Sequence, residues 1–492
     1  MPQHASPYTT AMSRPCDATV TVSARAAGPP GPALPRTVRY SPGAMTATVV
    51  SRRSVLRGLA LAGGGVLLTG SFERLWAERK AATAPGYGPL GPVLDRTTGL
   101  PLLRLPPGFS YASFGWVGDP LANGGRTPGF HDGMAVVKSS PEQVWLVRNH
   151  EVRGRGATIG PAALTYDPAA PGGTTTLVVD VRTGTLREAR LSLAGTSTNC
   201  AGGPTPWHSW LSCEETVEDF DRPHGFVFEV PADGAARPEP LEALGRFVHE
   251  AVAIDPATGI VYQTEDRTTA GFYRFVPAKP GDLRAGGRLQ MLAVRDQPEA
   301  DLRGGQPAGT RHAVRWVDID DPLRPHAPGT TDTLGVFSQG RQRGGAVFAR
   351  LEGCWWERDR VWFTATSGGA VRAGQIWAYH PKRDELRLVY ESPGVETMDM
   401  PDNVTSGPRG TLVVCEDGTR PMQRLLGLTP AGEVFVLAEN AMVLEGSPNG
   451  LRGDFRRSEW AGAVFHDRWL FVNLLFPGVT FAITGPWERG PA

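Results

Sequence analysis

Short apolar runs recur along this chain, and this pattern constrains its fold more than any other feature. After about residue 100 no long run has the 3.6-residue period of a helix. Turn sequences such as DPATG (255–259) separate the runs, as between hairpin strands. Four runs end in acid: VWLVRNHE (144–151), WHSWLSCEE (207–215), GIVYQTED (259–266) and GTLVVCED (410–417). RVWFTATSGG (360–369) and RWLFVNLLFPG (468–478) are similar runs without the acidic end.

The spacing of these runs indicates repeated units. About six strand–hairpin units follow one another, with centres mostly about 50–65 residues apart. Repeats of this size built from antiparallel strands predict an all-β fold, a β-propeller of about six blades. The wide gap between two runs predicts inserted loops on one face at 277–345. A β-sandwich or a pair of barrels is the structural alternative.

Composition is consistent with this fold. Hydrophobic residues make up 40% of the 492 positions and charged residues 20%, which is enough for a packed core. The 61 glycines and 44 prolines suit many short strands and turns. The formal net charge is zero, so no basic field indicates a nucleic-acid partner or attraction to a membrane surface.

The N-terminal part of the sequence has features of an export signal. SRRSVLRGLALAGGGVLLTG (51–70) places Arg52 and Arg53 before a weakly apolar segment that is too short and glycine-rich for a stable membrane span. This pattern is typical of the twin-arginine signal, which predicts export to the periplasm, cell envelope or medium. We therefore predict an extension over 1–50 that is disordered or precedes the true start, a signal segment over 51–84, and one catalytic propeller domain over 85–492.

The acidic run ends suggest a metal site. Inner strands of a propeller lie along its axis, so acidic ends on several blades would meet at one mouth of the channel. Such carboxylates repel one another strongly unless cations neutralise them. The residues expected there are Glu151, Glu214, Glu215, Glu265, Asp266, Glu416 and Asp417. Oxygen ligands suit Ca²⁺ or Mg²⁺.

Cys200 adds a softer ligand to this prediction. It stands in a glycine turn, whereas Cys213, Cys354 and Cys415 lie on or beside apolar runs. A thiolate favours a transition metal, so Cys200 beside carboxylates predicts a mixed cluster rather than a lone calcium. The chain has five cysteines and no CxxC pair, which argues against a disulfide framework or a zinc ribbon.

Further polar residues lie in turns or at strand starts near the predicted mouth. Arg350 and Glu352 stand two apart in FARLE, so they share a face if the segment is a strand. The other candidates are Glu250, Asp402, Asn403 and Glu459. None of these residues lies within or beside a GxSxG, P-loop or GxGxxG motif, so serine-hydrolase and nucleotide-binding readings lack support.

Several of these strings together resemble a known family. NCAGGPTPWHSWLSCEE (199–215) is the longest; the others are HDGM (131–134), RNHE (148–151), GRFVHEA (245–251), YQTED (262–266), EGCWW (352–356), PDNV (401–404) and FPGVTFAITGPW (476–487). In this order they resemble the PhoX-type bacterial alkaline phosphatases. The resemblance covers roughly residues 95–487.

The resemblance implies a propeller that hydrolyses phosphomonoesters with Fe³⁺ and Ca²⁺ at its mouth. Cys200 would be the thiolate on iron, and Arg350 would clamp the phosphate. Glu215, Glu250 and Glu352 would bind metal, as would Asp402 and Glu459. Two alternatives stay open: another metal-dependent hydrolase, such as a phosphodiesterase or lactonase, and a non-catalytic calcium-binding propeller. The expected partners are a small phosphomonoester and the twin-arginine export machinery, without nucleic acid and without a stable membrane span in the mature protein.

The export signal yields a first prediction. Changing Arg52→Lys and Arg53→Lys together should hold the protein in the cytoplasm, because the receptor reads the arginine pair itself. Cell fractionation and immunoblotting would locate the variant beside the wild type. Normal export of the double variant would contradict the assignment.

Overall fold

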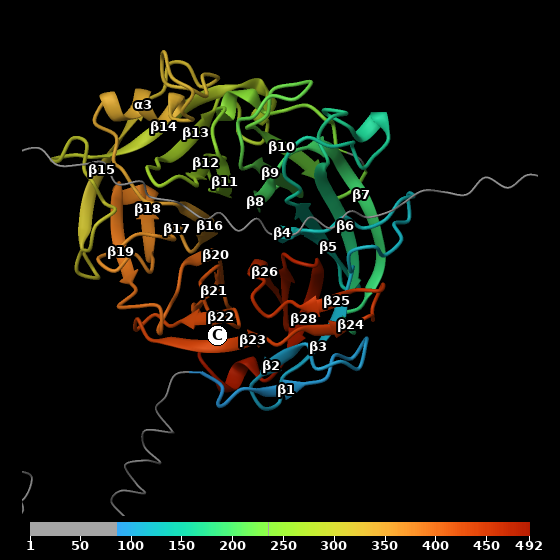
Figure 1. Cartoon of the computed structure of the whole chain (residues 1–492). Coiled ribbons are helices and arrows are strands. Elements are labelled where there is room, and N and C mark those ends of the chain that lie inside the picture. Colours follow the sequence, from blue (N-terminus) through green and yellow to red (C-terminus); the bar gives the residue numbers. More distant parts are fainter. Residues whose placement is uncertain (1–85, 235) are drawn as a thin grey trace, which may run out of the picture. The chain divides into compact units, whose positions relative to one another are not determined.

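The computed structural model describes residues 86–234 and 236–492. The predicted extension and signal segment therefore lie outside the described residues. Within the described part, antiparallel sheets surround a central axis, which confirms the predicted all-β propeller (Figure 1). No helix in this part is long and apolar enough to cross a membrane.

The first three blades follow one another along the chain. The first consists of β4 (His131–Ser139), β5 (Gln143–His150), β6 (Gly172–Asp180) and β7 (Leu186–Thr196). The second consists of β8 (Asn199–Pro204), β9 (Ser209–Glu214) and β10 (Val227–Pro231). The third consists of β11 (His249–Ile254), β12 (Val261–Glu265), β13 (Phe272–Pro277), β14 (Gly287–Val294) and β15 (Arg311–Asp318).

The other three blades complete the ring. The fourth consists of β16 (Leu351–Glu357), β17 (Arg360–Ala365), β18 (Gln375–His380) and β19 (Glu385–Glu391). The fifth consists of β20 (Pro401–Ser406), β21 (Leu412–Glu416), β22 (Arg424–Leu428) and β23 (Val434–Asn440), extended by β2 (Leu103–Leu105) and β1 (Gly91–Val93). The sixth consists of β26 (Trp460–His466), β27 (Trp469–Leu474), β28 (Val479–Thr484) and β3 (Ser110–Phe114).

The ring is closed by strands from both ends of the described chain. β3 pairs antiparallel with β28, so a segment near residue 112 forms the outer strand of the last blade. β2 pairs with β23 in the fifth blade. The hydroxyl of Tyr111 accepts hydrogen bonds from the backbone N–H of Leu102 and Leu103, which fixes the two segments to each other.

The segment 277–345 contains regular structure as well as loops. It holds β14 and β15, the two outer strands of the third blade, and helix α3 (Gly335–Gln342). β15 also pairs with β19, so it joins the third and fourth blades into one sheet. A small hairpin of β24 (Val443–Glu445) and β25 (Arg452–Asp454) lies between the fifth and sixth blades in sequence. Residues 86–234 and 236–492 also form short 3₁₀ turns at Ala162–Leu164, Glu242–Leu244, Leu283–Ala285, Pro381–Arg383 and Trp487–Arg489.

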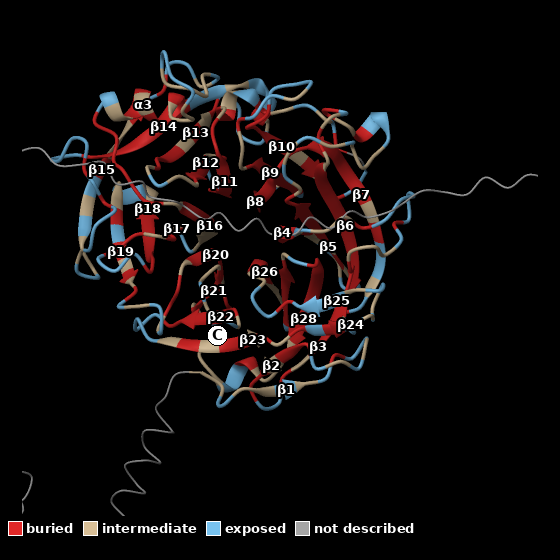
Figure 2. Cartoon of the chain, viewed as in Figure 1, coloured by how far each residue is buried: buried red, intermediate tan, exposed pale blue. Residues whose placement is uncertain are grey.

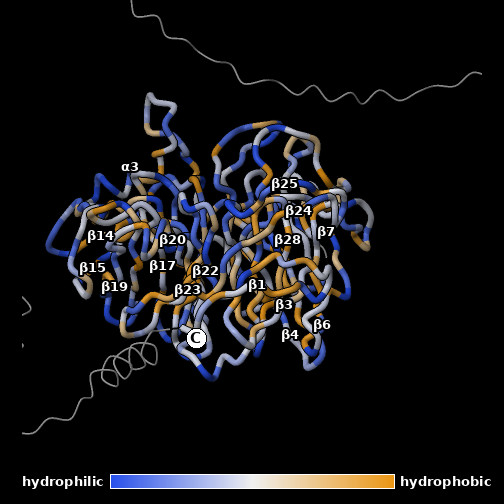
Figure 3. The backbone as a smooth tube through the Cα atoms, turned by 60° about the horizontal axis from the view of Figure 1, so that its bottom comes forward, coloured by the Kyte–Doolittle hydropathy of each residue, from blue (hydrophilic) through white to orange (hydrophobic). Residues whose placement is uncertain are grey.

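Apolar packing holds neighbouring blades together. One buried cluster joins the third and fourth blades, and another joins the fourth and fifth. Figure 2 shows buried residues along the strands around the axis and exposed residues mostly in the outer loops. Figure 3 shows the same division by hydropathy, with apolar segments along strands and polar segments in loops. The central strands can therefore carry polar residues at one end without losing their packing.

Small residues near the start of the inner strands let those strands approach closely. A Cβ atom on Gly353 would lie 2.7 Å from both Asp402 O and Val404 N of β20. A Cβ atom on Gly133 would lie 2.5 Å from the Cα of Ala201 in β8. Both contacts are with backbone of the next blade, which cannot rotate away. Glycine at these two positions thus sets the spacing of the blades at the axis.

This close approach predicts that Gly353→Ala destabilises the ring. Overpacking against backbone should cost about 1–3 kcal/mol and lower Tm by several degrees. Gly304→Ala is the matched control, because a Cβ there meets nothing within 4 Å. Thermal unfolding of both variants would be compared with the wild type. Equal Tm values for Gly353→Ala and the wild type would show that the blades adjust freely.

Candidate metal centre

Each inner strand begins at the same mouth of the channel and is irregular near its start. The register between the first and second strands shifts in all six blades, for example between Asn199 and Gly202. In five blades, the residue that directly follows the last regular pair before this shift is a potential ligand. These residues are Asp132, Cys200, Glu250, Glu352 and Asp402. In the sixth blade the acid is Glu459, directly before β26.

A second set of acids follows the second strand of four blades. These are Glu151, Glu215, Asp266 and Asp417. The backbone N–H of Glu151 donates to Phe130 O at 2.8 Å, and the N–H of Glu215 donates to Thr198 O at 2.9 Å. These bonds hold the second acid of a blade beside the start of its inner strand. The repeat therefore delivers both sets of side chains to one place.

The side chains converge into three overlapping groups. Ligand atoms lie within 4.8 Å of one another inside each group. The groups are Asp132–Glu151–Cys200, Cys200–Glu215–Glu250 and Glu250–Glu352–Asp402. Cys200 Sγ lies 3.1 Å from Glu250 Oε1. Because Cys200 and Glu250 each belong to two groups, the arrangement suits adjacent cations that share ligands.

The remaining acids of the site lie beside these groups. Burial raises the pKa of the Glu352 and Glu215 carboxyls, and the charge of nearby Asp266 raises both further. Burial likewise raises the pKa of Glu459, and the neighbouring Asp417 adds to this shift.

Glu265 and Glu416 were predicted as ligands, but the structure places them in other contacts. Glu265 accepts hydrogen bonds from Gly271 N and the hydroxyl of Tyr273, both at 2.8 Å. Glu416 binds Arg424 and accepts the N–H of Asp399 at 2.7 Å. Successive residues of a strand point to opposite sides, so only the second acid of each pair can face the axis. The sequence alone does not show which member of each pair faces the axis.

Glu214, like Glu265 and Glu416, interacts with nearby donor groups instead of the other acids of the cluster. It accepts the N–H groups of Ser197 and Gly225, and it binds the imidazole of the buried His224. The first acid of the pair thus anchors a loop, while Glu215 joins the cluster. Glu214 and Glu416 are thus held by nearby backbone and side-chain donors, whereas only Oε2 of Glu265 accepts hydrogen bonds from the described residues.

Arg350 lies at the edge of the cluster. Its Nε is 3.1 Å from Asp266 Oδ1, and its Nη2 binds Glu352. The backbone of Arg350 is left-handed, with φ of 49°, a conformation that a non-glycine residue adopts at a cost. The residue directly before the inner strand is also left-handed in three other blades: Phe130, Thr198 and Met400. Arg350 therefore turns at the entry of β16 so that its guanidinium meets two cluster acids.

Arg153 is a second cation at this edge, and no sequence motif predicted it. It forms an ion pair with Glu151 and lies 3.5 Å from Glu215 Oε2. Its side chain is 69% exposed, against 27% for Arg350. Asp132 was also missed as a ligand, although its string HDGM was recognised. Aligning HDGM with NCAG and HEAV as strand starts would have revealed it.

Burial and mutual repulsion shift the pKa values of these groups upward. Desolvation is the largest cause, and neighbouring carboxylates add to it. The pKa is well above its ordinary value for Asp132, Cys200, Glu215, Glu250, Glu352 and Glu459. That of Asp402 is raised to about 7. Full ionisation of the cluster is therefore unfavourable without added positive charge.

The donor set fits metal cations. Glu250 Oε2 is buried and has no hydrogen-bond partner in the described part of the chain, which is costly for a carboxylate oxygen. Carboxylates suit hard cations such as calcium, and a thiolate suits a transition metal such as iron. The other described cysteines, Cys213, Cys354 and Cys415, are buried within apolar clusters. Cys200 alone among the described cysteines belongs to a candidate ligand group.

Comparison with known proteins agrees with this geometry. The family model for alkaline phosphatase PhoX matches residues 85–478. No curated protein sequence matches the chain. The structure of Pseudomonas fluorescens PhoX in complex with vanadate, a transition state analogue, is 17% identical with a TM-score of 0.60, and the match covers 82% of this chain and 98% of that one.

Two further solved structures match more distantly. A catalytically inactive virginiamycin B lyase from Staphylococcus aureus with quinupristin has a TM-score of 0.37 and 12% identity, over 76% of this chain and 99% of that one. The periplasmic gluconolactonase of Pseudomonas aeruginosa has a TM-score of 0.33 and 14% identity, over 78% and 91%. The family match spans most of the chain and ends just before β28, the third strand of the sixth blade. The chain belongs to the PhoX alkaline phosphatase family, a family of phosphomonoesterases.

Proposed function

We propose that this alkaline phosphatase hydrolyses small phosphomonoesters at the propeller mouth, using iron and calcium ions held by the convergent side chains. The observation that carries the proposal is the set of three ligand groups joined through Cys200 and Glu250. Such a density of buried acids is costly unless cations occupy it.

Cys200 is the proposed iron ligand. Its sulfur lies among Asp132, Glu151, Glu215 and Glu250, so a thiolate there would complete a mixed sulfur and oxygen site. The proposed calcium ligands are the acids further along the cluster: Glu352, Asp402, Glu459, Asp266 and Asp417. Glu250 would bridge the two parts, because it belongs to a group on each side.

Arg350 and Arg153 are proposed to bind and orient the phosphate. Arg350 uses Nε and Nη2 for Asp266 and Glu352, and its Nη1 has no hydrogen bond among residues 86–234 and 236–492. Arg153 likewise uses Nε and Nη2 for carboxylates. Guanidinium groups held in this way can present their remaining N–H donors to an oxyanion without reorganising.

The bound cations would supply positive charge around the phosphate oxygens and would lower the pKa of bound water. The side chains of the protein would position the ester. A serine nucleophile is not required, which agrees with the lack of a GxSxG motif in the sequence. The acids of the cluster would bind and neutralise the cations, and the two arginines would bind the substrate anion.

We also propose that the enzyme is exported folded by the twin-arginine route and acts outside the cytoplasm. The support is the SRRSVLRG string. Cys200, Cys213, Cys354 and Cys415 are all free in the structure, so folding of the described part requires no oxidising compartment.

The thiolate assignment predicts a specific loss of iron. Cys200→Ser should lose iron and most activity, since serine is a poor substitute for a thiolate. Cys213→Ser, Cys354→Ser and Cys415→Ser are the controls, because their sulfurs lie in apolar clusters. Elemental analysis and monoester hydrolysis would be measured for all four variants. Iron retained in Cys200→Ser, or lost only in a control, would refute the assignment.

The arginine roles predict a loss of rate without loss of metal. Arg350→Ala should remove about 2–4 kcal/mol of transition-state stabilisation and lower kcat/KM by about 10²–10³. Arg153→Ala should have a smaller effect, about tenfold, because solvent screens its exposed side chain. Arg155→Ala is the matched control, since Arg155 pairs with Asp221 instead of a cluster acid.

Metal content, kcat and KM would be determined for each arginine variant with monoester, diester and lactone substrates. If metal-loaded Arg350→Ala kept the full kcat/KM of the wild type, Arg350 would have only a structural role, as the partner of Asp266 and Glu352. Preference for a diester or a lactone would assign the site to another metal-dependent hydrolysis.

A further inference from the structure

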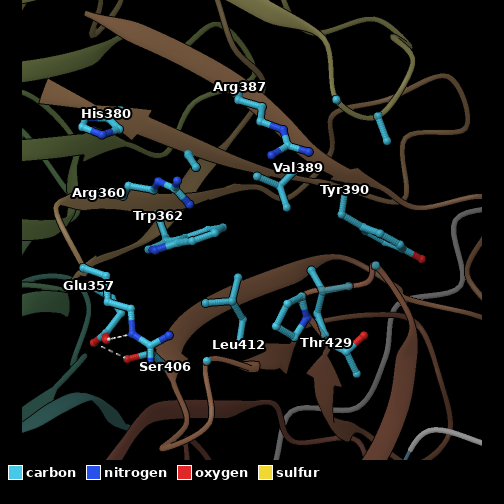
Figure 4. Close-up of a pocket in the computed structure, with 18 of the residues that line it drawn as sticks. Glu357, Arg360, Trp362, His380, Arg387, Val389, Tyr390, Ser406, Leu412 and Thr429 are labelled. Carbon is cyan, nitrogen blue, oxygen red and sulfur yellow. Dashed lines mark hydrogen bonds and ion pairs between the residues drawn. The ribbon is translucent and has the colours of Figure 1, made fainter. Parts of the chain in front are cut away.

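A cavity lies between the fourth and fifth blades. It has a volume of about 600 Å³ and is lined on one side by β17, β18 and β19 and on the other by β21, β22 and the turn after β22 (Figure 4). Its volume is in the usual range for small-molecule sites.

This cavity is distinct from the metal centre. Glu352 stands at the start of β16, whereas Glu357 at the end of the same strand lines the cavity. Five residues of strand span about 17 Å. A ligand in the cavity would therefore not touch the cluster.

The pairing of strands places the lining side chains in one row. Trp362 pairs with Ala378, Ala378 pairs with Arg387, and Arg387 pairs with Arg311. Directly paired residues share one face of a sheet. Arg360 and Val389 stand two positions from Trp362 and Arg387, so they lie on the same face. The small side chain of Ala378 leaves space in the middle of this face.

The opposite wall is mainly apolar. Leu412 and Leu428 belong to the buried cluster that joins these two blades, and Thr429 follows them. Figure 4 shows Arg360 and Arg387 reaching over Trp362 and Val389, with Leu412 and Thr429 across the gap. The cavity thus has an indole and aliphatic floor with guanidinium groups at its rim.

The acids near the rim are already occupied. Glu385 forms an ion pair with Arg311. Glu357 forms an ion pair with Arg358 and accepts a hydrogen bond from the hydroxyl of Ser406. Glu391 accepts the N–H of Gln306 and the amide of Gln375. Arg360 and Arg387 have no ion pair in the part of the chain that the structure describes. The free charge at the rim is therefore positive.

We propose that this cavity binds a small organic anion with a flat apolar body and one oxyanion head group. The body would lie between Trp362 and Leu412, where it displaces water from apolar surface. The head group would accept hydrogen bonds from Arg360 and Arg387. Neither arginine takes part in the metal centre, so this site is independent of the proposed phosphatase chemistry.

The test uses 1-naphthoate as the probe and isothermal titration calorimetry on the metal-loaded enzyme. The neutral analogue 1-naphthamide serves as the comparison. The wild type should bind 1-naphthoate at least about tenfold more tightly than 1-naphthamide, as expected for a charge-assisted contact. The double change Arg360→Ala and Arg387→Ala should remove this preference, while Arg288→Ala, an exposed strand arginine outside the cavity, should keep it.

Ala378→Leu fills the middle of the cavity without changing its charge and should weaken binding of both probes. Hydrolysis of a monoester by each variant would report an intact fold and metal centre. Unsaturable binding of 1-naphthoate, or equal binding by the wild type and the double arginine variant, would overturn the proposal. Competitive inhibition of hydrolysis with a constant equal to the Kd would also overturn it, since the probe would then bind the metal centre.

Discussion

The repulsion among carboxylates on the propeller axis is the interaction on which the rest of this structure depends. Two carboxylates about 4.8 Å apart repel by about 3 kcal/mol even at an effective dielectric constant of about 20. Arg350 and Arg153 offset only part of this repulsion, since each is already paired with two acids. The cluster must therefore hold protons or cations, and a donor set that includes Cys200 favours metal cations.

The blades supply the rigidity that such a cluster requires. Polar side chains on the second strand of one blade donate hydrogen bonds to the backbone carbonyl of a candidate ligand residue in the next blade. Thr364 binds Asp402 O at 2.8 Å, and Asn473 binds Asp132 O at 2.6 Å. Asn149 does the same for Cys200 O at 3.0 Å. These three candidate ligands are thus positioned by two neighbouring blades, which themselves pack through apolar clusters away from the axis.

The sequence predicted the architecture because each blade repeats the same pattern of strands and turns. It also predicted most of the cluster, since acids at the ends of similar strands must lie together. The prediction did not separate Glu265 and Glu416 from Asp266 and Asp417, because adjacent residues differ only in which side of a strand they occupy. Asp132 was missed because the pattern of acidic run ends does not include residues that open a strand. The resemblance assigned roles to other strand-opening acids, such as Glu250 and Glu352, but not to Asp132.

Other features depend on contacts that no local pattern reveals. Arg153 is an example, because it follows an acidic run end in a loop that carries no strand or helix signal. The segment 277–345 is another, since β15 pairs with both β14 and the distant β19. The cavity between the fourth and fifth blades arises from the register of five strands, which cannot be read from one strand alone.

Metal analysis of the wild-type enzyme, exported by its own route and purified without chelator, tests the central claim most directly. The account predicts iron and calcium together, more than one cation per chain, and loss of hydrolysis when they are removed. Full hydrolytic activity in protein that contains less than one cation per chain would contradict it.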